Sequence, residues 1–120
     1  MEDRIQATIV KYLRSVGTFC HSIPNEGAGR NNAVRTAQLV TMGLFSGVGD
    51  LLVWWNTSDS VRLGYLEVKT ATGRQSERQK HFQEMCESHG IPYTVVRSVE
   101  DVQTYMKEMG FIKKPKGGGQ

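Results

Sequence analysis

The sequence predicts one α/β domain, built on a mixed β-sheet with a central hairpin and with helices on its flanks. Apolar residues at helical spacing alternate with short apolar runs, which gives the order α-β-α-β-β-α-β-α. The runs 47–55 and 61–70 enclose the polar segment 56–60, as expected for two strands joined by a turn. We expect the domain to cover residues 1–110. Residues 111–120, with three lysines and three glycines, would form a flexible basic tail.

The first half of the chain is expected to form a helix over 2–16, a strand over 18–23, a loop over 24–30 and a helix over 32–42. The first helix is predicted from four apolar residues that share one face: Ile5, Ile9, Leu13 and Val16. Gly17 would end this helix, because glycine readily adopts the backbone conformation that closes helices.

The second half is expected to contain a helix from Ser76 to near Gly90, a strand over 91–96 and a last helix that begins after Ser98. Ser76 and Gln79 have the Ser-x-x-Gln spacing of a capping box. The helix between the hairpin and the last strand is long enough to allow a crossover connection, so the sheet can be mixed.

The overall composition limits the functional classes. The net charge of +3 and the pI of about 9.0 are compatible with a polyanionic partner but do not require one. The chain has no membrane-length apolar run and no leader-like segment, so we expect a soluble, cytoplasmic protein with no membrane partner. Cys20 and Cys86 form no Cys-x-x-Cys pair and are expected to be buried, reduced thiols. The histidines have no metal-ligand spacing with one another: His21, His81 and His89.

Two acidic residues face each other in the predicted hairpin. With the turn centred between Ser58 and Asp59, Asp50 pairs with Glu67, which places their Cβ atoms roughly 5 Å apart. Two carboxylates this close repel each other unless a proton or a cation lies between them. Lys69 lies two residues after Glu67 and so points to the same face of the sheet. Two carboxylates and an ammonium group suit a hard divalent metal ion with a water molecule beside it.

Other interpretations of these residues stay open at this point. Asp50, Glu67 and Lys69 could form an exposed cross-strand ion pair on a half-solvated sheet. Glu2 lies on the inward edge of the first helix, where it could be a solvated acid near the helix N-terminus or a third carboxylate that reaches the metal. Gln79 could serve the helix cap alone, or it could turn toward the sheet and orient a phosphate or a water molecule.

The adjacent residues Trp54 and Trp55 must point to opposite faces of one strand. One could pack under a helix while the other forms a contact between two copies of the chain. Alternatively, helices cover both side chains. We expect the second arrangement, because helices are predicted on both flanks of the sheet.

Five short stretches occur in order at spacings that resemble one nuclease family: Glu2 with Gln6, 23–27, 47–51, 66–70 and 76–79. The layout resembles the PD-(D/E)xK nuclease superfamily, and within it the VRR-NUC (virus-type replication–repair nuclease) family in its small stand-alone phage and bacterial form. The resemblance spans residues 2 to about 109 and implies a restriction-endonuclease-like core. One departure is Gly49, where the family usually has proline. Glycine loosens that turn but leaves the Asp50 carboxylate in place.

The resemblance also implies roles by position. It assigns the metal ion, Mg²⁺ or Mn²⁺, to four residues: Asp50, Glu67, the Val68 carbonyl and, through water, Glu2. Lys69 would orient or help to deprotonate the attacking water and would stabilise negative charge on the phosphate. Gln79 would hold Lys69 or the scissile phosphate in position.

The activity that the resemblance implies is hydrolysis of DNA phosphodiester bonds by a structure-selective endonuclease. Small members of the family look like homodimeric Holliday-junction resolving enzymes. Two symmetric cuts in a four-way junction require two sites, which a C2 dimer supplies. Four basic residues are expected to contact phosphates without reading sequence: Arg30, Arg35, Arg74 and Lys80.

Two other classes of protein compete with this prediction. The first is a non-catalytic nucleic-acid-binding module on a nuclease-like fold, although such a module has no need of Asp50, Glu67, Lys69 and Gln79 together. The second is a small interaction or structural protein in which Asp50 and Glu67 are surface charges. Stabilisation by a divalent metal ion would distinguish the nuclease from this second class.

Overall fold

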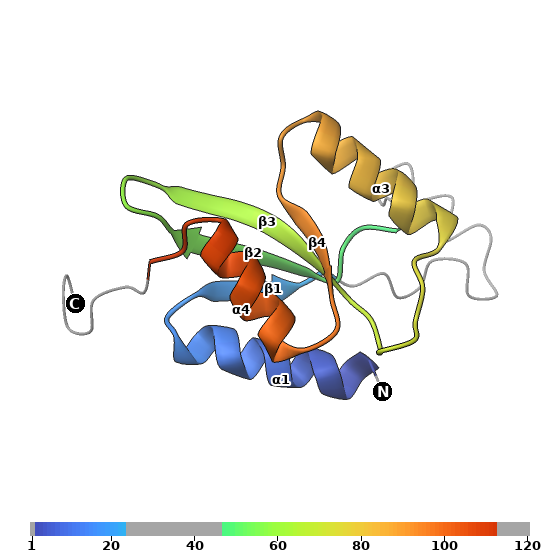
Figure 1. Cartoon of the computed structure of the whole chain (residues 1–120), viewed down its shortest axis with the longest axis horizontal. Helices are drawn as coiled ribbons and strands as arrows, with labels where there is room; N and C mark the ends of the chain where they lie inside the picture. The colour runs from blue at the N-terminus through green and yellow to red at the C-terminus, as the bar shows by residue number, and fades with distance from the viewer. Residues whose placement is uncertain (1, 24–46, 113–120) are drawn as a thin grey trace.

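The computed structural model describes residues 2–23 and 47–112 of the chain (Figure 1). The helix expected over 32–42 and the loop expected over 24–30 lie outside the described residues. The described helices and strands are α1 (Glu2–Ser15), β1 (Phe19–Ser22), β2 (Leu51–Asn56), β3 (Val61–Val68), α3 (Glu77–Ser88), β4 (Tyr93–Val96) and α4 (Val99–Glu108). The mixed α/β fold predicted from the sequence is confirmed.

The four strands form one mixed sheet in the order β1-β2-β3-β4. β1, β2 and β3 are antiparallel neighbours, whereas β4 runs parallel to β3 after the crossover through α3. The β2–β3 register runs from Leu51 opposite Leu66 to Asn56 opposite Val61. This register matches the prediction, and one further step along it brings Asp50 opposite Glu67.

Helices α1 and α4 lie side by side on one face of the sheet (Figure 1). The apolar stripe of α1 places Ile9 and Leu13 in the core, where both are 0% exposed. α4 begins at its N-cap Ser98 and buries the other side of the same core. The strand residues that meet the two helices alternate along the sheet, as the pleat requires: Cys20, Leu51, Val53, Trp55, Leu66, Val68 and Val96.

Helix α3 packs on the opposite face of the sheet, next to β3 and β4. Phe82 makes edge contacts with Tyr65 and Tyr93, at ring centroid distances of 4.9 and 5.9 Å. Glu67 alternates in phase with Tyr65 along β3 and therefore lies on this face. The site predicted from the sequence is thus on the side of α3, away from the main core.

The two tryptophans have different environments. Trp55 is buried in the core and donates its indole N–H to the Met109 carbonyl at 3.2 Å. Trp54 is 43% exposed on the other face, where its ring meets the edge of Phe19 at 4.8 Å. The expectation that helices cover both tryptophans is wrong for Trp54, because α3 packs over β3 and β4 and leaves this part of β2 exposed.

Phe111 and Ile112 follow the predicted domain end and are hydrogen-bonded to the domain. Phe111 packs against the core and donates its backbone N–H to the Met106 carbonyl, and Ile112 donates to the Asn56 carbonyl. These two residues, expected to begin the flexible tail, are therefore held by backbone hydrogen bonds. Residues 113–120 of that predicted tail lie outside the described residues.

Two composition-based expectations can be compared with the structure. Cys20 and Cys86 are buried free thiols, as predicted, and burial raises the pKa of both. In the described segments 2–23 and 47–112, no helix has the length and apolar character needed to cross a membrane.

Candidate active site

The loop that leads into β2 is shaped by two glycines. Gly47 has φ +94°, and a Cβ at this position would lie 2.7 Å from backbone atoms of Arg78 in the first turn of α3. Gly49 is buried, and a Cβ there would lie 3.0 Å from the Cβ of Tyr65 on β3. The Gly-x-Gly spacing thus lets the chain pass closely between α3 and β3 just before Asp50.

Asp50 and Glu67 occupy the same end of the hairpin, on its α3 face. The Asp50 side-chain Oδ2 accepts the backbone N–H of Val68 at 2.7 Å, and the Asp50 carbonyl accepts the N–H of Ile23 at 3.0 Å. The Asp50 carboxylate is therefore fixed against β3, while its backbone is fixed against the end of β1. Glu67 is 1% exposed. The interpretation as an exposed surface ion pair does not describe this buried carboxylate.

The environment of Glu67 favours its protonated form when no cation is bound. The pKa of Glu67 is raised to about 8, first by burial and then by the nearby Asp50 carboxylate, through its charge and a hydrogen bond between the two groups. The Lys69 ammonium acts in the opposite direction. A carboxylate with this degree of perturbation is typical of a functional site.

Lys69 lies on the same face, with its Nζ 3.8 Å from Glu67 Oε2. The Lys69 side chain is 10% exposed, so the ammonium is largely enclosed. Its backbone N–H donates to the Val96 carbonyl at 3.0 Å, which extends the parallel pairing of β3 and β4 by one residue. The sheet therefore holds the Lys69 backbone on this side.

Gln79 serves the helix cap and the site at once. Its Oε1 accepts the Ser76 backbone N–H at 2.8 Å, and the Ser76 hydroxyl accepts the Gln79 N–H, which completes the predicted capping box. Its Nε2 donates to Glu67 Oε2 at 2.8 Å. Gln79 therefore does not serve the cap alone but also turns toward the sheet, while a role in orienting a phosphate or a water molecule stays a prediction. The direct partner of the Gln79 side chain on the sheet is Glu67.

A second hydrogen-bonded chain reaches Glu67 from β4. The Tyr93 hydroxyl lies 3.5 Å from Glu67 Oε1, and Gln75 Nε2 donates both to this hydroxyl and to Gln83 Oε1. Burial and the charge of Glu67 raise the pKa of Tyr93, so this phenol remains a donor. Sequence reasoning missed Tyr93. The contact depends on the parallel pairing of Tyr93 with Tyr65, two residues before Glu67, which the sequence alone does not reveal.

Comparison with known proteins agrees with this arrangement. The profile of the VRR-NUC domain family matches residues 1–100. The chain belongs to the VRR-NUC family. A solved structure described as a VRR_NUC domain matches with a TM-score of 0.61 and 20% identity, over 88% of this chain and 94% of that chain. A second, described as a VRR_NUC domain protein, matches with a TM-score of 0.65 and 19% identity, over 89% and 85%. Among curated proteins there is no significant match.

Membership of the VRR-NUC family gives this chain a nuclease-like fold and indicates a hydrolase that binds DNA. The structures at 19–20% identity support the fold alone. The site described above lies within the matched residues, and the family relationship gives the half-buried Asp50 and the buried Glu67 and Lys69 a chemical context.

The acids of this VRR-NUC domain fit a divalent cation. Asp50 and Glu67 provide hard oxygen donors, and repulsion between their charges adds to burial in raising the pKa of Glu67. Glu2, at the start of α1, is exposed, and its charge also contributes to the raised pKa of Glu67. No three acidic, histidine or cysteine side chains of the described segments converge closely enough to hold a metal ion. A role of Glu2 at a metal ion stays a prediction.

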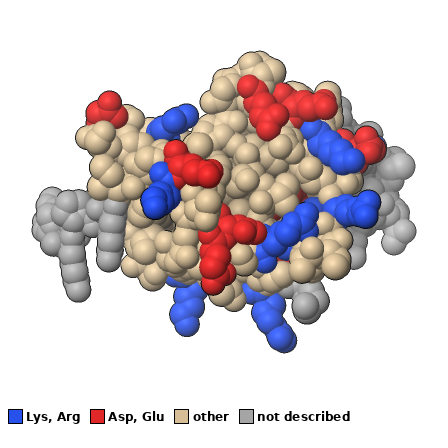
Figure 2. All heavy atoms as spheres, viewed as in Figure 1, with Lys and Arg blue, Asp and Glu red and all other residues tan. Residues whose placement is uncertain are grey.

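The predicted DNA-binding residues are only partly placed. Arg74 is exposed on the connection between β3 and α3, and Lys80 is exposed on α3, where it pairs with Glu77 at 3.5 Å. Arg30 and Arg35 lie outside the described residues. Figure 2 shows that basic and acidic side chains alternate on the displayed face and do not form one broad basic patch.

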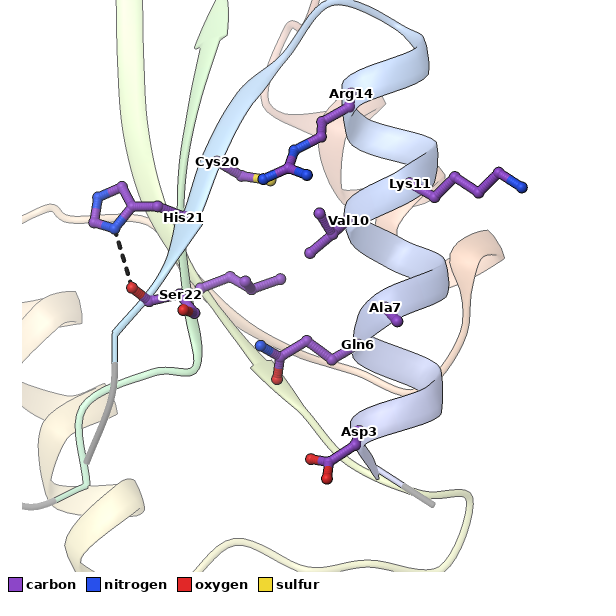
Figure 3. Close-up of a pocket in the computed structure, with 10 residues that line it drawn as sticks. Asp3, Gln6, Ala7, Val10, Lys11, Arg14, Cys20, His21 and Ser22 are labelled. Carbon is purple, nitrogen blue, oxygen red and sulfur yellow. Dashed lines mark hydrogen bonds between the residues drawn. The ribbon is translucent and has the colours of Figure 1, made fainter. Parts of the chain in front are cut away.

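A hollow of about 640 Å³ lies between α1 and β1 (Figure 3). Asp3 and Gln6 line one part of it, while the Arg14 side chain extends toward Cys20 at the other. Leu51 lines it but Asp50 does not. The hollow does not include the Asp50 and Glu67 carboxylates, and we assign it no part in the chemistry.

Proposed function

We propose that this protein is a metal-dependent, structure-selective DNA endonuclease that resolves four-way junctions as a homodimer. The observation that supports this proposal most strongly is the pair Asp50 and Glu67, fixed side by side with the Lys69 ammonium 3.8 Å from Glu67 Oε2. Burying ionisable side chains such as Glu67 and Lys69 destabilises a small domain unless their charges are compensated. In a family of nucleases, that cost is readily explained by catalysis.

Mg²⁺ or Mn²⁺ is the cation that we assign to Asp50 and Glu67, with the Val68 carbonyl as a further ligand and Glu2 contributing through water. When bound, this ion supplies positive charge that lowers the pKa of water and offsets charge on the phosphate. The Val68 N–H holds Asp50 Oδ2, which fixes the direction in which the carboxylate presents its other oxygen.

The remaining residues position groups and move protons. Lys69 orients or helps to deprotonate the attacking water, and its ammonium stabilises negative charge on the phosphate. Gln79 Nε2 donates to Glu67 Oε2 and the Tyr93 hydroxyl donates to Oε1, so the carboxylate is restrained from both sides. Arg74 and Lys80, with Arg30 and Arg35, would contact phosphates, which favours recognition of DNA shape over sequence.

An exposed apolar row supports the dimer. Phe19, Trp54 and Leu63 are consecutive cross-strand neighbours on β1, β2 and β3, and they are 54%, 43% and 44% exposed. Val61, two residues before Leu63, is 58% exposed. We propose that a second copy of the chain covers this row, because large apolar side chains gathered on one face are typical of contact surfaces. We also propose a cytoplasmic location, which the two free thiols support.

The decisive experiment is cleavage of a labelled synthetic four-way junction beside a linear duplex, in Mg²⁺, Mn²⁺ or EDTA. Asp50→Asn preserves an acceptor for the Val68 N–H but removes the charge, so we expect a loss of cleavage of about a thousandfold or more. Glu84→Gln is the matched control, because Glu84 is an exposed acid on α3. Paired, metal-dependent nicks in the junction would support a dimeric resolving enzyme.

Other outcomes would revise the proposal at defined points. Cleavage of flaps or plain duplex would retain the active site and reject the junction as substrate. Tight DNA binding without cleavage in either metal would favour a non-catalytic binding module. The absence of any thermal stabilisation by Mn²⁺ in the wild type would reject the metal assignment, independently of activity.

A further inference from the structure

The connection between β3 and α3 joins two residues of the site. It leaves the sheet directly after Lys69 and reaches α3 two residues before Gln79 (Figure 1). Its first part is a turn in which the Gly73 N–H donates to the Thr70 carbonyl at 3.2 Å. Displacement of this turn would change the direction of the main chain at Lys69. The contacts that hold this turn therefore affect the position of the Lys69 ammonium.

Arg97 holds this turn from outside the hairpin. It follows β4, and its Nη1 donates to the Thr70 carbonyl at 2.6 Å and to the Gly73 carbonyl at 2.7 Å. Hydrogen bonds from a charged donor are stronger than those between neutral groups. One guanidinium nitrogen thus bridges both ends of the turn, although no sequence motif relates Arg97 to Lys69.

Arg97 is itself fixed by neighbouring elements. Its backbone N–H donates to Asp101 Oδ2 at 2.8 Å in the first turn of α4. The preceding residue, Val96, accepts the Lys69 N–H. The turn after Lys69 is consequently held to β4 by its backbone on one side and by the guanidinium on the other.

We propose that Arg97 is a positioning residue for DNA cleavage: it fixes the turn 70–73 and, through it, the orientation of Lys69. This inference rests on the proposed nuclease function. It differs from the alternative that exposed Arg97 simply attracts DNA phosphate, because its Nη1 is directed at two protein carbonyls. A phosphate contact would affect DNA affinity and its salt dependence. A positioning role would affect the rate of the bound complex.

The test compares Arg97→Met, which retains a long side chain without donors, with Arg97→Lys. A single nitrogen makes both hydrogen bonds in the wild type, so a lysine ammonium can replace part of the interaction. Arg4→Gln is the control for loss of a nearby exposed charge, since Arg4 and Arg97 line a second, separate hollow between α1 and the start of α4. The readouts are the single-turnover cleavage rate at saturating DNA, the DNA Kd over a range of salt concentrations, and amide hydrogen exchange of residues 70–75.

We expect Arg97→Met to reduce the single-turnover rate about tenfold or more while Kd and its salt slope stay within about twofold of wild type. Arg97→Lys should recover a substantial part of the rate, and Arg4→Gln should leave it unchanged. Faster hydrogen exchange at Gly73 in Arg97→Met should accompany the loss. If Arg97→Met fails to fold, Arg97→Lys is compared with the wild type instead. We then expect a partial loss of the single-turnover rate and an unchanged Kd for DNA.

Several results would overturn the inference. An unchanged single-turnover cleavage rate in a folded Arg97→Met variant would show that Lys69 does not depend on the hydrogen bonds from Arg97 to the turn 70–73. A weaker Kd with a reduced salt slope and a normal saturated rate would identify Arg97 as a phosphate contact. If the wild type cleaves no DNA, the nuclease proposal fails first. In that case, an unchanged hydrogen-exchange rate at Gly73 in Arg97→Met would show that Arg97 does not hold the turn 70–73.

Discussion

Glu67 is a carboxylate that the fold removes almost completely from water and places beside a second carboxylate. Two neutral donors, from Gln79 and Tyr93, and one ammonium, from Lys69, surround it. This environment restrains the side chain strongly and favours its protonated form when no cation is bound. The chemistry at the residue scale is therefore sensitive to pH and to cations.

The metal-free protein should lose stability as pH rises. The pKa of Glu67 is about 8 in the folded protein and near 4.5 as a free group, so the folded state binds this proton more tightly than the unfolded state. The resulting stabilisation is fully present below about pH 4.5 and is lost as pH rises through about 8. In EDTA we expect Tm to fall over this range, by roughly 5 °C or more, in circular dichroism melts.

Two variants and one ion test the assignment of this pH dependence. Glu67→Gln should flatten the profile, whereas Glu84→Gln should preserve it, because Glu84 is an exposed acid. Added Mn²⁺ should restore Tm at pH 8 in the wild type but not in Glu67→Gln. A metal-free wild-type Tm that is constant or increases between pH 5 and 8 would contradict the prediction.

Gln79→Glu should separate the two roles of this side chain. Glutamate still accepts the Ser76 N–H and so preserves the helix cap, but it replaces the donor to Glu67 by a third negative charge. We expect cleavage to fall about tenfold or more, and Tm in EDTA to decrease at pH 8 but little at pH 5. Gln103→Glu, at an exposed position on α4, is the control. Equal losses in both variants would argue for a general charge effect.

At the scale of the elements, packing on the core side sets the position of β3. Gly64 lies where Trp55, Pro92 and Tyr105 meet, and a Cβ there would lie 2.8 Å from the Pro92 Cβ and from the Tyr105 hydroxyl oxygen. Glu67 near the end of β3, and Lys69 directly after the strand, follow Gly64 within a few residues, so the position of Gly64 affects both. A side chain at position 64 would therefore displace the strand or the rings around it.

Gly64→Ala should destabilise the domain by about 1–3 kcal/mol through overpacking, measured by urea unfolding. Tyr105→Phe alone should have a small effect, because the buried hydroxyl has no hydrogen-bond partner among the described residues. The double variant should recover part of the loss, since removing this oxygen relieves one of the two close contacts. Additive losses in the double variant would show that the hydroxyl is not the obstacle.

The sequence predicts the local parts of this architecture well, and the long-range contacts poorly. Turn chemistry and alternating apolar residues determine the register that pairs Asp50 with Glu67, and the Ser76–Gln79 spacing determines the start of α3. Tyr93 and Arg97 belong to a later strand and its exit. Their contacts with the site arise only from parallel pairing across a crossover, which no sequence spacing records.

The exposure of Trp54 was also not predictable from local pattern. Its alternation with Trp55 indicates opposite faces, but which part of the sheet a helix covers depends on where α3 packs. The predicted helix over 32–42 and two of the expected DNA contacts, Arg30 and Arg35, lie outside the described residues, so those predictions stay untested.

At the scale of the whole molecule, the apolar row Phe19, Trp54 and Leu63 should determine the oligomeric state. We expect light scattering with size-exclusion chromatography to give twice the chain mass of 13.4 kDa for the wild type. Trp54→Glu should shift the mass toward the monomer, because a charge on the row opposes burial by a second copy. Ile91→Glu is the control, since Ile91 is 41% exposed outside the row. A monomeric wild type at all concentrations would reject the dimer.

The register of the hairpin has a consequence for how this chain can change in length. Asp50 and Glu67 share a face because the same number of residues separates each of them from the turn. Inserting or deleting one residue within β2 or β3 would turn one of these acids toward the core, and would bring Leu51 or Leu66 to the site instead. Related chains can therefore accept length differences in these strands only in steps of two, or within the turn itself.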